Sequence, residues 1–255
     1  MRIWLLGLFT LALAGCATAP VLPPVAAFDP AALAETKFKS VLVAGDPSVL
    51  AFDHAAERLV RDLRTRTQSA GIVQLTARED HRTAAIPLAT TFNVLSTVEA
   101  MQPGPNEGCL LFITAHGAPK QGLALPRSSG DQFLAPSRLD IALARGCGNA
   151  PTIVVLSGCY TGTYLESAMT RDNRIVLTAA RADRASFGCG ANNQFTFFDQ
   201  CLLDTIEAMA GATWRDAFSR TRACVATREV SLNMLPSEPQ AHFGSAVAGM
   251  KLPWK

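Results

Sequence analysis

A cysteine and a histidine each follow a short apolar run in this 255-residue chain. The segment "TIVVLSGCYTG" (152–162) carries Cys159 after a β-branched run, and "LLFITAHG" (110–117) ends in His116 and Gly117. A thiol is mostly protonated at neutral pH, and an imidazole within reach both lowers its pKa and carries protons. The two residue types therefore predict nucleophilic thiol chemistry, with Cys159 as nucleophile and His116 as proton carrier.

Backbone groups beside this pair complete the chemistry. Gly117 leaves space next to His116, and the N–H groups of Gly117 and Cys159 are candidates for holding a developing oxyanion. Each donor of this kind supplies a few kcal/mol of transition-state stabilisation. The alternative is structural: Cys159 is then a small core hydrophobe and His116 a polar group that ends a strand.

Strand and helix patterns alternate along the chain. Apolar runs predict strands, and apolar residues at helical spacing predict helices with Ser137 and Gly146 bounding one of them. The predicted strands are 40–45, 71–76, 108–117, 152–158 and 174–180, and the predicted helices are 49–67, 91–102, 136–146, 195–210 and 213–227. This alternation favours a mostly parallel sheet with helices on both faces. Ligands bind at the carboxyl ends of such strands, where His116 and Cys159 both fall.

The N-terminus predicts an export signal. Residues 1–15 form a short apolar leader, too short to span a membrane, and they end in Leu-Ala-Gly before Cys16. That ending resembles a bacterial lipobox, which implies cleavage before Cys16 and a lipid anchor on it. The alternative is an ordinary secretory signal that contains a cysteine. Ala17, in the second mature position, indicates an outer membrane facing the periplasm if the host is Gram-negative.

The remaining chain predicts one domain behind a spacer. Residues 16–35 are rich in alanine and proline, which predicts an extended tether. Residues 36–255 are enough for one sizeable core and too few for two domains. The sequence does not indicate the oligomeric state.

Charge and motif content exclude several classes of function. The formal charge of +2 is scattered, without a basic stripe among aromatic residues, so nucleic acid is not an expected partner. The chain has no CxxC or HExxH motif, and its histidine and cysteine spacings fit no common zinc site. We therefore expect no metal, and the thiol chemistry requires no cofactor.

The two segments around His116 and Cys159 are similar to the two signatures of the legumain and GPI-transamidase peptidases. Their separation of 43 residues (159 minus 116) is close to that of caspases, to whose group this family belongs. Segments 40–59, 174–188 and 195–206 also resemble that family. The resemblance implies a caspase-like three-layer sandwich of about six strands. It also implies a cysteine endopeptidase that acts on peptides or proteins through a thioester acyl-enzyme, with transpeptidation if an amine captures the acyl group.

The same resemblance places five residues in substrate binding. These are Asp53, His54, Ser157, Ser186 and Asp199. The sequence also departs from the family pattern. Asp53 occupies a position where the family has an arginine, and Ser157 one where it has an acidic residue. Ala51 occupies the position of an asparagine that can orient the catalytic histidine.

These departures predict a change of substrate preference. A pocket that loses an arginine, gains Asp53 and keeps Asp199 is net acidic. Because a buried unpaired carboxylate is costly, such a pocket favours lysine or arginine at the cleaved position. Alternatively, Asp53 pairs with Arg181 or Arg184 and the pocket is neutral.

Five cysteines remain once Cys16 and Cys159 are set aside. An exported protein meets an oxidising compartment, but an odd number of cysteines cannot all pair. Cys201 and Cys224 lie on consecutive predicted helices, and we predict a disulfide between them. The other three are Cys109, Cys147 and Cys189.

Two other classes of function remain open. A catalytically silent lipoprotein that uses this fold as an envelope binding module is compatible with the departures at Ala51 and Ser157. Keeping both His116 and Cys159 argues against it, since a binding module has no use for that pair. A thiol–disulfide oxidoreductase would be expected to carry a CxxC motif, which this chain lacks.

Overall fold

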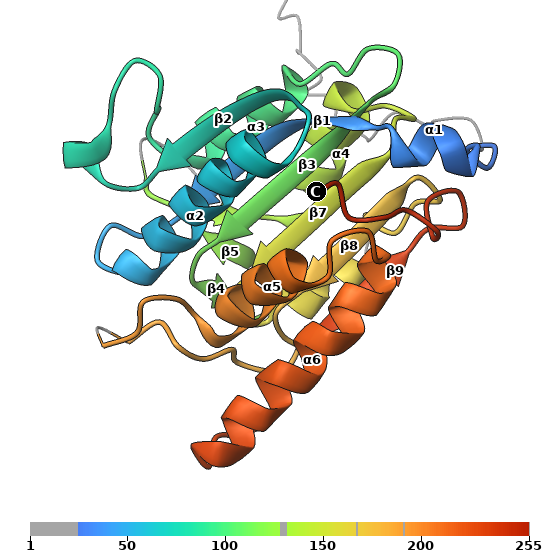
Figure 1. Cartoon of the computed structure of the whole chain (residues 1–255). Coiled ribbons are helices and arrows are strands. Elements are labelled where there is room, and N and C mark those ends of the chain that lie inside the picture. Colours follow the sequence, from blue (N-terminus) through green and yellow to red (C-terminus); the bar gives the residue numbers. More distant parts are fainter. Residues whose placement is uncertain (1–24, 128–131, 167, 191, 255) are drawn as a thin grey trace, which may run out of the picture.

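Figure 1 shows a central sheet with helices on both faces. The computed structural model describes residues 25–127, 132–166, 168–190 and 192–254. The predicted leader and Cys16 lie outside the described residues.

The main sheet has six strands in the order β2-β1-β3-β7-β8-β9. The first five run parallel, and β9 pairs antiparallel with β8 at the edge. The strands are β1 (Lys37–Ala44), β2 (Ser69–Thr76), β3 (Glu107–Thr114), β7 (Thr152–Ser157), β8 (Arg174–Thr178) and β9 (Gln240–Phe243). The predicted mostly parallel α/β sheet of about six strands is confirmed.

Alternate residues of each buried strand point to opposite faces and meet different helices. Leu110 and Phe112 of β3 pack with α2 (Leu50–Arg66), α5 (Phe197–Ala208) and α6 (Trp214–Ser231). Leu111 and Ile113 pack on the opposite face with α3 (Thr91–Glu99) and α4 (Pro136–Gly146). In Figure 1, α2, α5 and α6 accordingly cover the near face of the sheet. The central strands are apolar throughout because they are buried on both sides.

Short elements lie at the carboxyl end of the sheet and in the connections. A small second sheet joins β4 (Gly117–Ala118), β5 (Gly122–Ala124) and β6 (Phe133–Leu134). The 3-10 helices are Glu79–His81 and Thr161–Glu166. The predicted strand 108–117 is therefore split, because β3 ends at Thr114 and β4 begins at Gly117.

Two local predictions were wrong. Helix α4 is capped by Ala135 and begins with a proline, so Ser137 is not its cap. The segment expected to be an extended tether includes helix α1 (Pro30–Ala34), whose first turn is capped by Asp29. Leu33 of α1 is buried in the core, so the described end of that segment is packed onto the domain.

Two disulfides brace the helices. The predicted Cys201–Cys224 bond joins α5 to α6, which confirms that pairing. A second bond, Cys109–Cys147, joins the start of β3 to the residue after α4. This second bond was not predicted, because the two cysteines lie 38 residues apart in elements of different type.

We expect the double substitution Cys201→Ala/Cys224→Ala to lower the free energy of unfolding by about 2–4 kcal/mol, the typical effect of removing a cross-link from the unfolded chain. The bond closes a loop of 23 residues. Urea denaturation under non-reducing conditions measures the difference. An unchanged midpoint would contradict a stabilising role for this bond.

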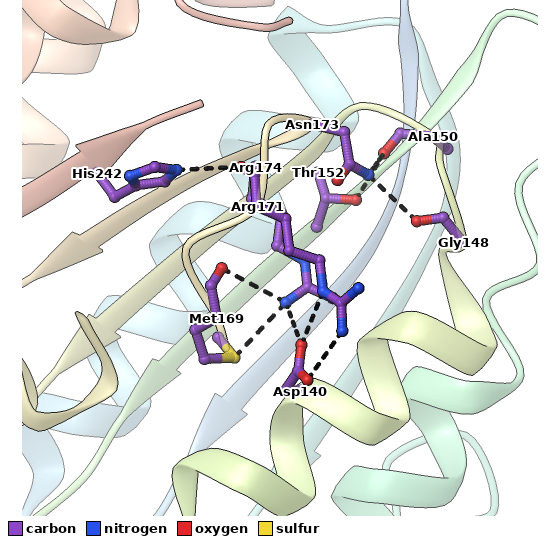
Figure 2. A network of polar contacts seen from close by, with 9 residues as sticks. All are labelled: Asp140, Gly148, Ala150, Thr152, Met169, Arg171, Asn173, Arg174 and His242. Atoms are coloured by element: carbon purple, nitrogen blue, oxygen red, sulfur yellow. Dashed lines mark hydrogen bonds and ion pairs between the residues drawn. The ribbon is translucent and has the colours of Figure 1, made fainter. Parts of the chain in front are cut away.

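A buried charge cluster fixes α4 to the start of β8 (Figure 2). The Asp140 carboxylate accepts hydrogen bonds from Arg174 Nη1 at 2.7 Å and from Arg171 Nε and Nη2 at 3.1 and 3.0 Å. Asp140 and Arg174 are each 1% exposed, and burial lowers the pKa of Arg174 to about 10. The cluster neutralises charge that the core could not otherwise hold.

Candidate active site

Strand pairing places His116 and Cys159 at the same edge of the sheet. Thr114, the last residue of β3, is the register partner of Ser157, the last residue of β7. Each candidate residue follows its strand end by two positions, and the Ala115 N–H still donates to the Ser157 carbonyl at 3.0 Å. Both side chains are half-buried. The two segments thus leave the sheet side by side.

Glycines allow the two strand ends to touch. A Cβ on Gly117 would lie 1.9 Å from the Cys159 carbonyl oxygen, and one on Gly158 would lie 2.5 Å from the Ala115 carbonyl oxygen. Only a residue without a side chain permits backbone approach this close. The two glycines therefore set the spacing between the histidine and cysteine segments.

We expect Gly117→Ala to lower any activity that depends on Cys159 by at least about tenfold, because the added methyl must push the Cys159 backbone away and small misplacements cost large factors. The matched control is Gly71→Ala on β2, where an added Cβ meets nothing within 4 Å. Rates are compared at equal folded protein, verified by thermal melts. Equal rates for both variants would contradict the tight-contact requirement.

The loop after β8 wraps the candidate thiol. The Ser186 N–H donates to Cys159 Sγ at 3.3 Å, and the thiol donates to the Ser186 carbonyl at 3.5 Å. The Tyr160 N–H donates to the Arg184 carbonyl at 2.8 Å, and Tyr160 has a φ of 60°. A left-handed backbone at a residue other than glycine is strained, and such strain is concentrated at functional sites. The local backbone turns sharply directly after Cys159.

His116 is held by the backbone and by one aromatic ring. Its carbonyl accepts a hydrogen bond from the Ala124 N–H at 2.7 Å. The Phe52 ring meets its imidazole edge-on, with centroids 5.4 Å apart. Ala51, at the position of the family's orienting asparagine, is a buried apolar residue. Its side chain offers no acceptor, so position 51 supplies no third member of a triad.

Asp199 lies beneath the strand ends at the start of α5. It is fully buried, and its Oδ2 accepts from Thr114 Oγ1 at 2.7 Å. Burial raises the pKa of Asp199, while the hydroxyls of Ser157, Thr114 and Thr196 act in the opposite direction. Within the described residues, its Oδ1 has no hydrogen-bond partner. A hydrogen-bond donor, a proton or a cationic group would satisfy that oxygen.

Asp53 occupies a different position. It is buried, and its Oδ1 accepts from Thr76 Oγ1 at the end of β2 at 3.0 Å. Burial raises the pKa of this carboxyl as well, with Thr76, Arg78 and His81 acting against the shift. Strand β1 separates β2 from β3, so Asp53 and Asp199 are held at the ends of non-adjacent strands.

The arginines considered as partners for Asp53 make other contacts. Arg181 pairs with Asp183 and with Glu238. The alternative prediction that Arg181 pairs with Asp53 is therefore wrong. The Nε of Arg184 is buried and, among the residues that the structure describes, has no hydrogen-bond partner. The second carboxylate oxygen of Asp53, Oδ2, is likewise without one there.

His54 contacts the segment that leads into α5. Its Nδ1 is 3.0 Å from the Gln194 carbonyl, and its ring meets Phe195 edge-on at 6.4 Å between centroids. Of the predicted binding residues, the structure thus places Ser186 at the thiol, Ser157 at the end of β7, Asp199 at the start of α5 against Thr114, and His54 and Asp53 on α2.

Sequence comparison identifies the family. A model described as the Peptidase C13 family matches residues 72–249, which is more than half of the chain. The chain belongs to the peptidase C13 family. The C13 membership supports a cysteine-peptidase function with a peptide or protein substrate. No curated protein matches this C13 chain significantly.

Structural comparison shows the caspase fold for this C13 chain. Caspase-1 from Spodoptera frugiperda superimposes with a TM-score of 0.56 at 11% identity. The match covers 82% of this chain and 87% of that chain. The expected caspase-like architecture is confirmed.

Three residues at the C13 site were missed by sequence reasoning. Phe52 meets the His116 ring, Tyr160 directly follows Cys159, and Cys189 lies on the loop between β8 and α5. Phe52 precedes Asp53 and Tyr160 follows Cys159, but neither residue type indicates on its own that it belongs to a site. Cys189 was noted only as one of five remaining cysteines, since parity cannot say which one stays free.

The described part of the C13 chain has no helix long and apolar enough to cross a membrane. Within it, no group of three or more histidine, cysteine, aspartate or glutamate side chains gathers as metal ligands would.

The raised pKa of Asp199 predicts a pH-dependent stability. The folded state holds the carboxyl proton more tightly than the unfolded state, so stability is lost as pH rises from 3.8 through the folded pKa. Relative to Asp199→Asn, the wild type should therefore lose unfolding free energy across that range. Urea denaturation at several pH values measures it. Asp172→Asn, at an exposed aspartate whose side chain accepts from the Ser245 hydroxyl, is the control. Parallel curves for wild type and Asp199→Asn would contradict this expectation.

Proposed function

We propose that this chain is a cysteine endopeptidase in which Cys159 attacks the peptide carbonyl. The observation that carries the proposal is the strand register: His116 and Cys159 follow the paired ends of β3 and β7, and Gly117 packs against the Cys159 backbone. The attack forms a thioester acyl-enzyme, and water then hydrolyses it.

In this proposal His116 takes the thiol proton and delivers it to the leaving amine. The N–H groups of Gly117 and Cys159 stabilise the oxyanion, because they belong to the two backbone segments that touch at the strand ends. An amine that replaces water at the acyl-enzyme gives transpeptidation instead. No cofactor takes part in either step.

Substrate binding is assigned to Asp53, His54, Ser157, Ser186 and Asp199, with cleavage after lysine or arginine. Two facts support the basic preference. Asp199 has an unpartnered buried oxygen among the described residues, and Arg181 is engaged by Asp183 and Glu238 instead of neutralising the acids. A cationic substrate side chain that reached Asp199 would satisfy this oxygen and hold the carboxyl in its charged form.

The test is a matched peptide panel with lysine, arginine, asparagine or aspartate at the cleaved position. Wild type and Cys159→Ala are compared under reducing conditions, with products identified by mass. Cleavage after lysine or arginine that is absent in Cys159→Ala is the expected result. Cleavage after asparagine alone would overturn the basic preference and keep the peptidase.

A silent binding module is the second candidate, favoured by the apolar Ala51 where the family has an orienting asparagine. It predicts no turnover with any peptide and no covalent labelling of Cys159 by a thiol-reactive substrate analogue. That combined result would replace the peptidase proposal.

We also propose that the mature chain is lipid-anchored through Cys16 and faces the periplasm from an outer membrane. The lipobox-like ending of the leader is the support. Cys16→Ser should move the protein from the membrane fraction to the soluble fraction. An unmodified Cys16 in the mass spectrum of the native protein would overturn the assignment.

A further inference from the structure

Two described cysteines stand apart from the disulfides. Four of the six described cysteines are paired, and Cys159 and Cys189 carry free thiols. Both are half-buried and therefore partly open to solvent. The compartment expected for an exported chain forms disulfides. A pair of free thiols there calls for an explanation.

The loop that wraps Cys159 also carries Cys189. Ser186 contacts Cys159 Sγ through both its N–H and its carbonyl, and Cys189 follows three residues later. Between them Gly188 has a φ of 99°, and an added Cβ would lie 2.6 Å from Phe197 N. The Phe197 N–H donates to the Phe187 carbonyl at 3.0 Å, which anchors this turn to the start of α5. The turn folds the chain over the strand ends.

The electrostatic surroundings of Cys189 agree with that position. Burial raises the pKa of the Cys189 thiol, and the neighbouring Cys159 and Asp46 raise it further. Asp46 follows the end of β1, and Cys159 follows the end of β7. Because Ser186 touches the Cys159 sulfur, the segment that carries Cys189 lies at the carboxyl edge of the sheet, next to the proposed nucleophile.

We propose that Cys189 is a redox modification site of this chain: it forms a reversible disulfide with Cys159, and the bond switches the peptidase off. The inhibitory part rests on the proposed function, because it takes Cys159 as the nucleophile. The disulfide itself does not depend on that assignment.

The oxidant is a small disulfide of the glutathione class. The Cys159 thiolate attacks one sulfur of the oxidant, which forms a mixed disulfide and releases one thiolate. The Cys189 thiolate then attacks the Cys159 sulfur and displaces the second. The two cysteines lose two protons and two electrons, and the oxidant becomes two thiols.

The loop, and not β7, is the segment that must adjust to form this bond. Disulfide geometry requires Cα atoms about 4.4–6.8 Å apart, so Cys189 and Cys159 must reach that spacing. The described residues between β8 and α5 form no helix or strand. Movement there breaks few backbone contacts compared with movement of β7.

The test equilibrates the full chain in buffers with increasing ratios of oxidised to reduced glutathione and then alkylates the remaining thiols. Trypsin alone is insufficient, because Cys159 shares peptide 146–171 with Cys147 and Cys189 shares 185–215 with Cys201. Adding chymotrypsin, which cleaves after Leu156 and Phe195, separates Cys159 from Cys147 and Cys189 from Cys201. The cross-linked peptide is identified by mass before and after dithiothreitol.

We expect a Cys159–Cys189 peptide that rises with oxidation as peptidase activity falls at least tenfold, both reversed by dithiothreitol. Cys189→Ser should lack the cross-link and collect the glutathione adduct on Cys159. The proposal is overturned if Cys189 stays alkylatable in the oxidised wild type. If the reduced wild type cleaves no peptide while the cross-link forms, the proposed function fails and the thiol pairing stands.

Discussion

His116→Ala is expected to lower kcat/KM for peptide cleavage by about 10²–10⁴-fold, the range typical for removal of a general acid–base group. Without the imidazole, the Cys159 thiol keeps its proton and the leaving amine receives none. The fold should survive, because His116 is half-buried and its contact with the Ala124 N–H uses the backbone carbonyl.

A second readout separates this role from packing against Phe52. The rate of Cys159 alkylation by iodoacetamide at neutral pH should fall in His116→Ala, because no imidazole remains to take the thiol proton during the reaction. His81→Ala is the control, since His81 is an exposed histidine beside Glu57. Unchanged alkylation and cleavage rates in His116→Ala would remove this histidine from the mechanism.

Asp140→Asn is expected to destabilise the fold by about 3–5 kcal/mol, because it leaves the buried Arg174 charge without its partner. Among the described residues, Arg174 is the most buried cation, at 1% exposed, and its Nη2 already has no hydrogen-bond partner there. The loss of its carboxylate partner is therefore expected to be costly. Urea denaturation measures the loss.

Two variants test the cause. Asp172→Asn alters an exposed aspartate whose contact is the Ser245 hydroxyl, and it should change stability by less than about 0.5 kcal/mol. Asp140→Leu combined with Arg174→Met removes both charges and should recover part of the loss. If the double variant is as unstable as Asp140→Asn, the loss of stability comes from packing and not from the unpaired charge.

Local patterns in the sequence were sufficient for most of the fold. The five parallel strands and the helices around them follow from apolar runs and helical spacing, which depend on neighbouring residues alone. The edge strand β9 was not predicted, because Gln240–Phe243 is short, half-buried and paired with a strand more than sixty residues earlier. Helix α1 was not predicted, because its Ala/Pro-rich composition does not indicate that Leu33 packs into the core of the domain.

The site was predictable to the extent that strand ends define it. His116 and Cys159 were placed at one edge because parallel strands share that edge. The separation of Asp53 from Asp199 was not predictable, since it depends on how far α2 is rotated about its axis and on which strand end each carboxyl meets. The pairing of Arg181 with Glu238 joins residues 57 positions apart, and no local pattern encodes it.

The late position of β9 in the chain also affects how the protein is made. All five parallel strands are synthesised before Gln240–Phe243, so the outer edge of β8 has no partner until the C-terminal segment emerges. An open apolar strand edge is a template for pairing with another chain. By pairing with β8, the four residues of β9 cover that edge and remove the template for aggregation.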